Sequence, residues 1–407
     1  MSRWRRRPAR GADWAAVALA LALGPVSMPG PAPAESWTLG GDARAYGFLR
    51  ADDPEGGRRD AELVIGRLKL DGTLPERLGV EAHGVFSLLS PAATPAARIA
   101  PAGTTRRFLG LQHTFPSGDD ASMTLEADRL NVRWERGGLR LVAGRQAITW
   151  GVNVFWPALD LFAPFGPERI DREYKPGVDA VRGTLALGEL SQIEVVGAAL
   201  GSSLARDGSA GALARVNLGP ADVGLMVGRF HADTVAGGFV TANVRGTGLR
   251  GEVAFTDSGD AGDAEIGRRR FWRAGLGLDR QLTTTVSVTG ELAWNGFGAT
   301  RPGDYPSIAG ADRVRRGELN GLGRSYFGGA VSWQAHPLLT LTGTGLVNLG
   351  DGSALLLPQA DWSLSDSVGL VVGGAFGIGR GPRGVSRPES EYGGAPQLLY
   401  AALKVYF

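Results

Sequence analysis

The 407-residue sequence contains no cysteine, which excludes a disulfide framework and metal sites built on thiolates. It also has no run of 18 or more apolar residues, so helices that span a membrane are excluded. Histidine occurs only at His83, His113, His231 and His336. None of the four has a recognisable spacing for a Ser/His/Asp triad or a metal site. We therefore expect neither an enzyme nor a bound cofactor.

The N-terminus has the three parts of a secretion signal. Five arginines between Arg3 and Arg10 precede an apolar stretch from Trp14 to Leu23, and the segment ends in Ala32-Pro33-Ala34, a small-x-small pattern that signal peptidases accept. The apolar stretch is far shorter than the roughly 20 residues that a membrane-spanning helix needs. We expect residues 1–34 to be a cleaved signal peptide and residues 35–407 to be the mature domain.

Removal of residues 1–34 changes the charge balance. The mature chain keeps 38 basic and 40 acidic residues of the original 43 and 41, so its net charge is near −2. The pI of about 9.0 is thus a property of the precursor. It gives no support for a nucleic-acid partner.

The composition combines 63 glycines with 43% apolar and 21% charged residues, which is too rich in glycine for helical domains and too apolar for disorder. We expect glycine to relieve crowding where strands bend around a closed barrel. From Trp37 onward, segments of about ten residues alternate apolar and polar positions, as in transmembrane barrels. In the last segment one face holds Leu399, Ala401, Leu403, Val405 and Phe407, and the other holds Tyr400, Ala402, Lys404 and Tyr406.

This alternation predicts an all-β fold, a single antiparallel transmembrane β-barrel of about 18 strands. The expected strands are 37–50, 61–71, 77–89, 122–136, 138–149, 177–188, 190–201, 211–219, 221–231, 236–245, 248–257, 269–279, 283–296, 323–334, 338–348, 354–364, 367–379 and 397–407. Residues 105–115 are a further strand candidate within a loop. The short links should be periplasmic, and the long links 90–121, 150–176, 297–322 and 380–396 should be extracellular.

The C-terminus resembles the assembly signal of Gram-negative outer-membrane proteins. The final aromatic residue, Phe407, follows apolar residues at every second position, Val405 and Leu403. This resemblance implies insertion into outer-membrane lipid by the barrel-assembly machinery. In architecture the mature chain also resembles the outer-membrane porins and the 18-stranded alginate-export-like channels, and no motif in it fixes the transported molecule.

The long link 150–176 is unusual for an exposed loop. Its apolar side chains would form a large patch in water: Val152, Val154, Phe155, Trp156, Leu159, Leu161, Phe162 and Phe165. We expect the link to fold into the lumen as a constriction loop, where its charged residues would meet charges of the wall. These are Asp160, Glu168, Arg169, Asp171, Arg172, Glu173 and Lys175. Packing across the rim, or against another protomer, is the structural alternative.

Arginine is the majority charge on the faces that we expect to point away from lipid. The predicted pore-lining residues are Arg129, Arg133, Arg145, Arg182, Arg215, Arg250, Arg273 and Arg324, with Glu81, Glu135, Glu252, Glu291 and Asp361 as interior acids. Several arginines around one constriction would favour anions. Alternatively, they pair with the acids in a network that fills the lumen.

These features together predict a porin-like outer-membrane channel for small hydrophilic solutes, with anions as the candidate class. Two alternatives remain open: a conduit for polysaccharide export, and a plugged barrel with a structural or surface-interaction role. The sequence leaves the oligomeric state undecided, and a homo-oligomer is among the candidates.

Overall fold

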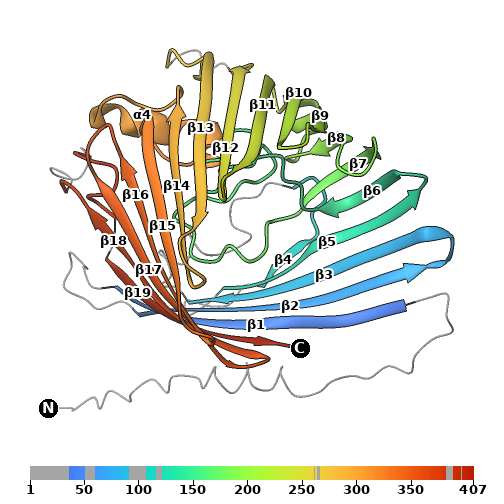
Figure 1. Cartoon of the computed structure of the whole chain (residues 1–407), viewed down its shortest axis with the longest axis horizontal. Helices are drawn as coiled ribbons and strands as arrows, with labels where there is room; N and C mark the ends of the chain where they lie inside the picture. The colour runs from blue at the N-terminus through green and yellow to red at the C-terminus, as the bar shows by residue number, and fades with distance from the viewer. Residues whose placement is uncertain are drawn as a thin grey trace, which may run out of the picture.

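The computed structural model describes residues 36–50, 60–90, 107–115, 122–260, 262–263, 266–381, 388–395 and 397–407. The predicted signal peptide, residues 1–34, lies outside this part of the chain. The described strands form one antiparallel sheet that closes on itself, with β1 (Ser36–Arg50) paired to β19 (Leu398–Tyr406). Figure 1 shows these strands surrounding a central space. Closure leaves the wall without an edge strand, as a membrane-spanning sheet requires.

Eighteen strands of the described chain build the wall, and each pairs with its neighbour in sequence. Between β1 and β19 they are β2 (Asp60–Leu74), β3 (Leu78–Leu89), β5 (Ser122–Arg136), β6 (Leu139–Gln146), β7 (Val178–Ala186), β8 (Gln192–Ala199), β9 (Gly208–Asn217), β10 (Ala221–Phe230), β11 (Asp233–Val244), β12 (Thr247–Asp257), β13 (Arg270–Gln281), β14 (Val286–Asn295), β15 (Ser325–His336), β16 (Leu339–Asn348), β17 (Ala354–Ser365) and β18 (Val368–Ile378). Each of the 18 predicted strands is confirmed.

The remaining strand, β4 (Gln112–Phe115), pairs with β5 beyond the point where β6 ends. It falls in the segment 105–115, which the sequence analysis gave as a strand candidate within a loop. Because β3 still pairs with β5 along the same residues, β4 lengthens the wall locally without adding a strand to its circumference.

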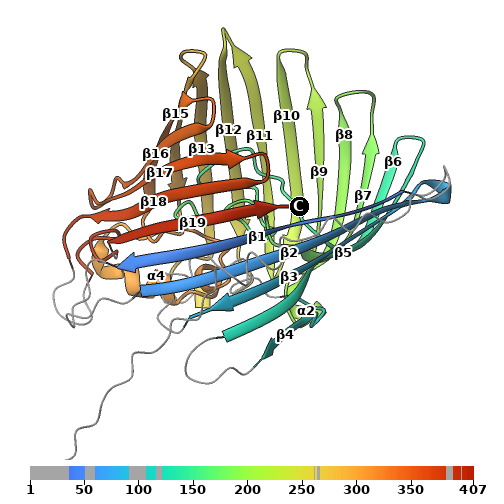
Figure 2. The same ribbon diagram turned by 90° about the horizontal axis from the view of Figure 1, so that it is seen from below.

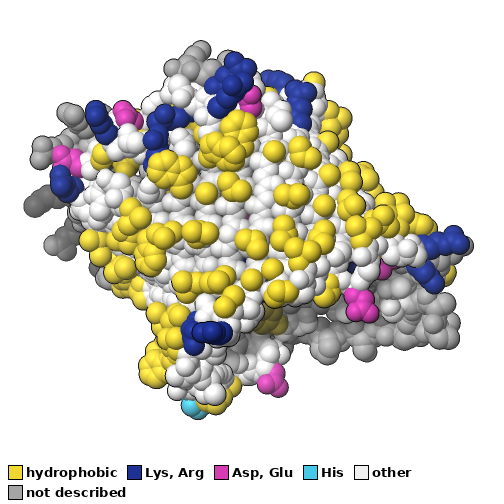
Figure 3. All heavy atoms as spheres, turned by 45° about the horizontal axis from the view of Figure 1, so that its top comes forward, with side chains coloured by type: hydrophobic (Ala, Val, Ile, Leu, Met, Phe, Trp, Pro, Cys, Tyr) yellow, Lys and Arg dark blue, Asp and Glu magenta, His cyan; other side chains and the backbone are white. Residues whose placement is uncertain are grey.

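The two-residue period of the strands separates a lipid face from a lumen face. In β13, Phe271 and Arg273 are buried inside, while Trp272 and Leu276 are 55% and 68% exposed outside. Figure 3 shows the same arrangement over one side of the molecule, where apolar side chains cover the middle and charged ones gather near the margins. The apolar outer belt around a closed barrel identifies an integral membrane barrel of the outer-membrane type.

The links differ in length between the two ends of the barrel. At one end the turns have between two and five residues, as between β5 and β6 or β7 and β8. The other end carries the long links and the helices η3 (Pro302–Asp304), α2 (Leu204–Asp207), α4 (Tyr305–Gly310) and α5 (Asp312–Arg315), whereas η1 (Pro75–Arg77) forms the short β2–β3 turn. Figure 2 shows the tight turns at the top and α2 and α4 at the opposite end. Short turns are periplasmic in such barrels. No helix in the described residues is long and apolar enough to cross a membrane.

The last residue completes the closure. The amide of Gly41 donates to the carbonyl oxygen of Phe407 at 2.7 Å, and the amide of Phe407 donates back at 3.0 Å. A Cβ at position 41 would lie 2.6 Å from the Phe407 ring, so glycine is required for this contact. Leu403 and Phe407 are 39% and 50% exposed on the outer face. Their role in assembly stays a prediction.

We expect Leu276→Arg to destabilise the barrel by about 2–4 kcal/mol, because it would place a charge in the lipid-facing belt. The matched control is Thr340→Arg, since Thr340 lies on the lumen face opposite Asp361. Urea unfolding in phospholipid bilayers measures both. Equal stability of the two variants would contradict the assignment of faces.

Candidate functional site: a loop inside the barrel

The link between β6 and β7 lies inside the barrel, as predicted. Figure 1 shows it as the green segment within the ring of strands. Trp150, Leu159 and Phe162 are at most 1% exposed and belong to a cluster with wall residues that include Met226 and Phe230. Phe155 joins a second cluster with Leu346 and Leu355 on the other side of the lumen. The apolar patch is therefore buried, and the loop spans between two walls.

Two wall glutamates hold the backbone of this loop. The Glu252 carboxylate accepts hydrogen bonds from the amides of Val152, Asn153 and Leu159, the last at 3.0 Å. The Glu291 carboxylate accepts from the three consecutive amides 154–156 at 2.8, 3.1 and 2.8 Å. These residues lie outside helices and strands, so the amides need partners elsewhere. Charge-assisted bonds to carboxylates are among the strongest available.

Wall glycines provide the space in which the loop sits. A Cβ at Gly237 would lie 2.7 Å from the side chain of Leu159, and one at Gly328 would lie 2.6 Å from that of Phe155. At Gly275 the side chain of Asn153 occupies the same position. At these positions glycine serves close packing of the loop, in addition to the bending of strands that we expected.

The end of the loop is held by charges on β1 and β2. The Tyr174 ring receives three cations, with Arg44, Arg67 and Lys69 at 5.2, 4.1 and 4.6 Å from its centroid. Next to it, Asp171 pairs with Arg44. Such cation–π contacts are strongest where water is excluded, and Arg44 and Arg67 are only 1% and 2% exposed. This end of the loop is thus held by buried charged groups of the wall.

Lys175 and Asp160 tie the loop to itself. Their charged groups are 2.5 Å apart, and the Arg129 guanidinium donates to the backbone carbonyl of Lys175. Arg129 also pairs with Asp128 at 2.8 Å. These predicted residues are therefore brought together, although in ion pairs and not around an opening.

Most of the other predicted arginines also face carboxylates. Arg145 lies 2.8 Å from Asp179, Arg133 lies 3.3 Å from Glu135, Arg182 lies 4.0 Å from Glu194, and Arg250 contacts Asp279. Arg215 covers the Phe239 ring at 5.2 Å. Arg324 lies 5.5 Å from the ring centroid of Trp294, a residue of the outer face, and is separate from the lumen group. The eight arginines are thus distributed along the wall and do not form one ring.

Several residues of the site were not selected from the sequence. Arg44 and Arg67 lie on the inward faces of their strands, so alternation could have found them. Asp128 is 1% exposed and accepts from Arg67, Arg107 and Arg129. It lies at the irregularity in the β3–β5 register, where alternation changes phase, so counting residues places it on the wrong face.

One side of the lumen remains open beside the loop. A cavity of about 450 Å³ lies between loop residues Pro167, Arg169, Ile170, Arg172 and Glu173 and the inner faces of β16, β17 and β19. On the wall side it is lined by Thr342, Thr344, Leu357, Gln359, Tyr400, Lys404 and Tyr406. Mainly polar side chains thus face the arginine-bearing edge of the loop.

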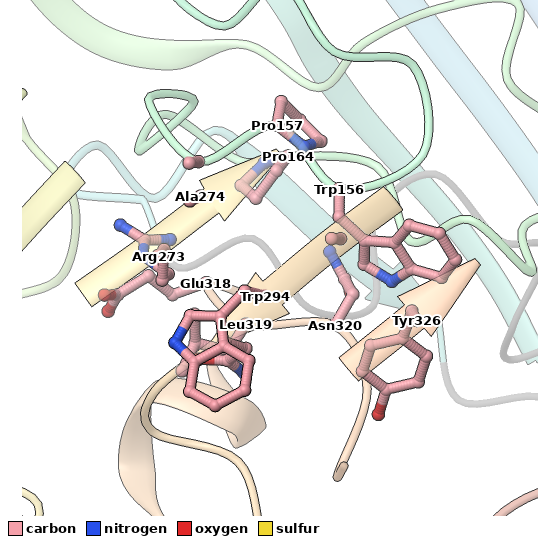
Figure 4. Close-up of a pocket in the computed structure, with 13 residues that line it drawn as sticks. Trp156, Pro157, Pro164, Arg273, Ala274, Trp294, Glu318, Leu319, Asn320 and Tyr326 are labelled. Carbon is pink, nitrogen blue, oxygen red and sulfur yellow. The ribbon is translucent and has the colours of Figure 1, made fainter. Parts of the chain in front are cut away.

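The extracellular end of the site is covered by the link between β14 and β15. Figure 4 shows a small pocket there, which is lined by Trp156 and Pro164 of the β6–β7 loop, by Arg273 of β13 and by residues 318–320 of the covering link. Arg273 is 5% exposed. Glu318 pairs with Arg313 at 2.8 Å and Arg316 at 3.0 Å. The two links therefore meet through packed side chains at this end.

Arg313 is the central residue of the covering link. It is 1% exposed and also lies 3.0 Å from Asp233 at the start of β11. Burial alone would lower the pKa of the Arg313 guanidinium, but Glu318, Asp233 and Asp263 together hold that pKa above its usual value. The guanidinium therefore stays charged and fastens the link to the rim.

The predicted residue Glu168 folds back onto its own loop. Its carboxylate lies within 3.0 Å of the position that a Cβ at Gly166 would take, so it packs against the backbone of Gly166. Glu173 pairs with Lys404 of β19 at 3.2 Å, and the Arg172 guanidinium donates to the carbonyl of Val154 at 2.8 Å. Of the charged loop residues, Arg169, Arg172 and Glu173 border the cavity.

No known family model matches the sequence, and no curated protein is similar to it. Solved structures with the same architecture include the outer membrane protein OprD from Pseudomonas aeruginosa, at 12% identity and a TM-score of 0.55, covering 92% of this chain and 93% of that one. Acinetobacter baumannii OccAB1 matches at 9% identity and 0.54, covering 91% and 96%. Pseudomonas aeruginosa OccD3 (OpdP) matches at 11% and 0.52, covering 92% of both. The likeness establishes a porin-like outer-membrane barrel fold.

We expect Glu252→Gln and Glu291→Gln to release the loop while leaving the barrel folded, because an amide replaces one acceptor oxygen with a donor. Hydrogen bonds to charged groups contribute about 1.5–3 kcal/mol each, so a loss of about 3 kcal/mol would raise amide exchange about a hundredfold. Hydrogen exchange of residues 152–159 measures the effect. Asp361→Asn is the matched control, since Asp361 bonds Gln359 on the wall. Unchanged exchange in both glutamate variants would contradict the anchoring role.

Proposed function

We propose that this barrel is a porin-like channel through which small hydrophilic solutes cross the outer membrane between the loop and the β16–β19 wall. The observation that carries this proposal is the cavity of about 450 Å³ bordered by Arg169 and Arg172 on one side and by Thr342 and Thr344 on the other. The loop fills the opposite half of the lumen with packed apolar side chains. A narrowed polar path beside a fixed loop suits size-limited passage of solutes.

Anions are the favoured class of solute. Of the charged residues that line the cavity, Arg169, Arg172 and Lys404 are basic and only Glu173 is acidic. The lining therefore carries more basic than acidic side chains, with Arg169 and Arg172 on the side of the loop. Basic side chains at a constriction attract anions and repel cations.

The competing proposal is a barrel that its own loop plugs. The six hydrogen bonds from backbone amides to Glu252 and Glu291 favour it. A loop held that firmly could close the path if the remaining cavity did not connect both ends. Export of a polysaccharide has no specific observation in its favour. The absence of enzymatic activity, assembly by the barrel-assembly machinery and the oligomeric state stay predictions.

Single-channel recording in planar bilayers tests the passage. We expect conductance from the mature protein and a larger conductance after deletion of residues 152–172, because the deletion removes the loop from the lumen. Silence of the intact protein with large openings of the deletion variant would identify a plugged barrel. Silence of both, with a folded barrel, would exclude a pore.

The position of the path is tested by Thr344→Trp, which we expect to reduce conductance several-fold by adding an indole to the cavity wall. Leu341→Trp is its control on the same strand, because Leu341 lies on the outer face beside Trp333. Equal conductance of the two variants would place the path elsewhere.

Ion selectivity is tested by the double variant Arg169→Gln/Arg172→Gln. We expect the reversal potential in a KCl gradient to shift away from the chloride side, since two positive charges leave the constriction. Arg324→Gln removes a charge beside Trp294 and should leave the reversal potential unchanged. A shift of the same size in both variants would contradict the assigned selectivity site.

A further inference from the structure

Three potential metal ligands lie together on the lumen wall, apart from the loop and its cavity. Asp71 of β2 pairs in register with Glu81 of β3, and His83 follows two residues later on the same face. The His83 Nε2 atom is 3.7 Å from an Asp71 carboxylate oxygen and 3.6 Å from a Glu81 carboxylate oxygen. One ligand atom from each of the three residues lies within 4.8 Å of the other two.

The imidazole of His83 is the unusual member of this group. Its side chain is 11% exposed, and neither ring nitrogen has a hydrogen-bond partner among the described residues or contact with solvent. Buried polar atoms without partners are uncommon and costly. The flanking carboxylates are too distant for a hydrogen bond to Nε2, although both present an oxygen towards it.

Glu81 is also oriented from outside the group. The Asn131 side-chain amide donates to its Oε2 atom at 2.7 Å, which leaves Oε1 facing His83. Outer hydrogen bonds of this kind fix the direction of a ligating carboxylate. Asp71 and Glu81 are 54% and 35% exposed, so an ion could enter from the lumen and keep water in its remaining positions.

We propose that Asp71, Glu81 and His83 bind a divalent transition-metal ion, of the class of Cu²⁺, Ni²⁺ and Zn²⁺. Bonds of about 2.0–2.2 Å in a tetrahedral arrangement separate ligand atoms by about 3.3–3.6 Å. Both carboxylate distances to His83 Nε2, 3.7 and 3.6 Å, are close to this range, and the exposed carboxylates of Asp71 and Glu81 can rotate towards each other. One imidazole nitrogen with two carboxylate oxygens suits these ions better than Mg²⁺ or Ca²⁺, which take oxygen ligands.

Neighbouring cations limit the affinity. The Arg129 guanidinium lies 3.9 Å from Glu81, and Lys69 is the cross-strand partner of His83. Their positive charges oppose the ion, while the two carboxylates of the site offset its charge. We therefore expect reversible binding, weaker than in closed structural sites, at a wall position about five residues from the periplasmic turn.

Copper binding to the full mature barrel in detergent, prepared without a polyhistidine tag, tests the site. Titration with CuSO₄ followed by electron paramagnetic resonance should give one site with coupling to an imidazole nitrogen. We expect His83→Gln to abolish this signal and Asp71→Asn to weaken binding about tenfold or more. His113→Gln is the matched control, since His113 is exposed on β4 and should bind as the unchanged protein does.

Heat-modifiable migration in gels shows whether each variant still forms the barrel. Absence of the imidazole signal in the folded unchanged protein would overturn the proposal. So would an equal signal in the folded His83→Gln variant. Isothermal titration with ZnCl₂ provides the second measurement, with the same order of affinities expected among the four proteins.

The binding itself does not rest on the proposed function, because it is measured without current. A barrel that binds Cu²⁺ through His83 and never conducts would refute the channel and support the metal site. A barrel that conducts and binds no metal would support the channel and refute the metal site. If both hold, Zn²⁺ should change the current of the unchanged channel and leave that of His83→Gln unaffected.

Discussion

Backbone amides that enter a membrane barrel without their own secondary structure need acceptors, and this requirement governs the lumen. Glu252 and Glu291 supply them for six amides of one loop. Neither carboxylate would be tolerated on the outer face, where lipid provides no hydrogen bonds. These two side chains therefore determine which faces of β12 and β14 point inward. They also determine where the loop lies. The packing of Trp150, Leu159 and Phe155 follows from that position.

The loop makes the lumen asymmetric. Towards β8–β12 the wall is apolar and packs against the loop, with Gly237 of β11 where the Leu159 side chain approaches closely. Towards β1, β2 and β5 it carries arginines, each set against a carboxylate or the ring of Tyr174. Towards β16–β19 it carries mainly polar side chains and borders the cavity beside the loop. Three parts of one wall thus differ in role: one packs against the loop, one pairs with its charged end, and one borders the cavity.

The strands and the burial of the loop could be predicted from the sequence, because a two-residue period and a large apolar link are local signals. The inward positions of Glu252 and Glu291 followed from the same period. The loop amides that these carboxylates bind could not be predicted, because every residue except proline has a backbone amide and the sequence does not mark which ones will be bound. Asp128 was missed because a register irregularity reverses the alternation there. Arg324 precedes the first residue of β15, where the alternation that placed it inside no longer applies.

The contacts of the loop also constrain the order of folding. Its amides bind glutamates that lie 93 to 137 residues further along the chain, on strands in the second half of the barrel. Contacts between such distant residues form late, because the intervening chain must be ordered first. A chain folded only as far as β11 would therefore have ten strands of the wall and an apolar loop without its two glutamate partners. The loop can therefore reach its final position only after β12 and β14, which carry these glutamates, are in the wall.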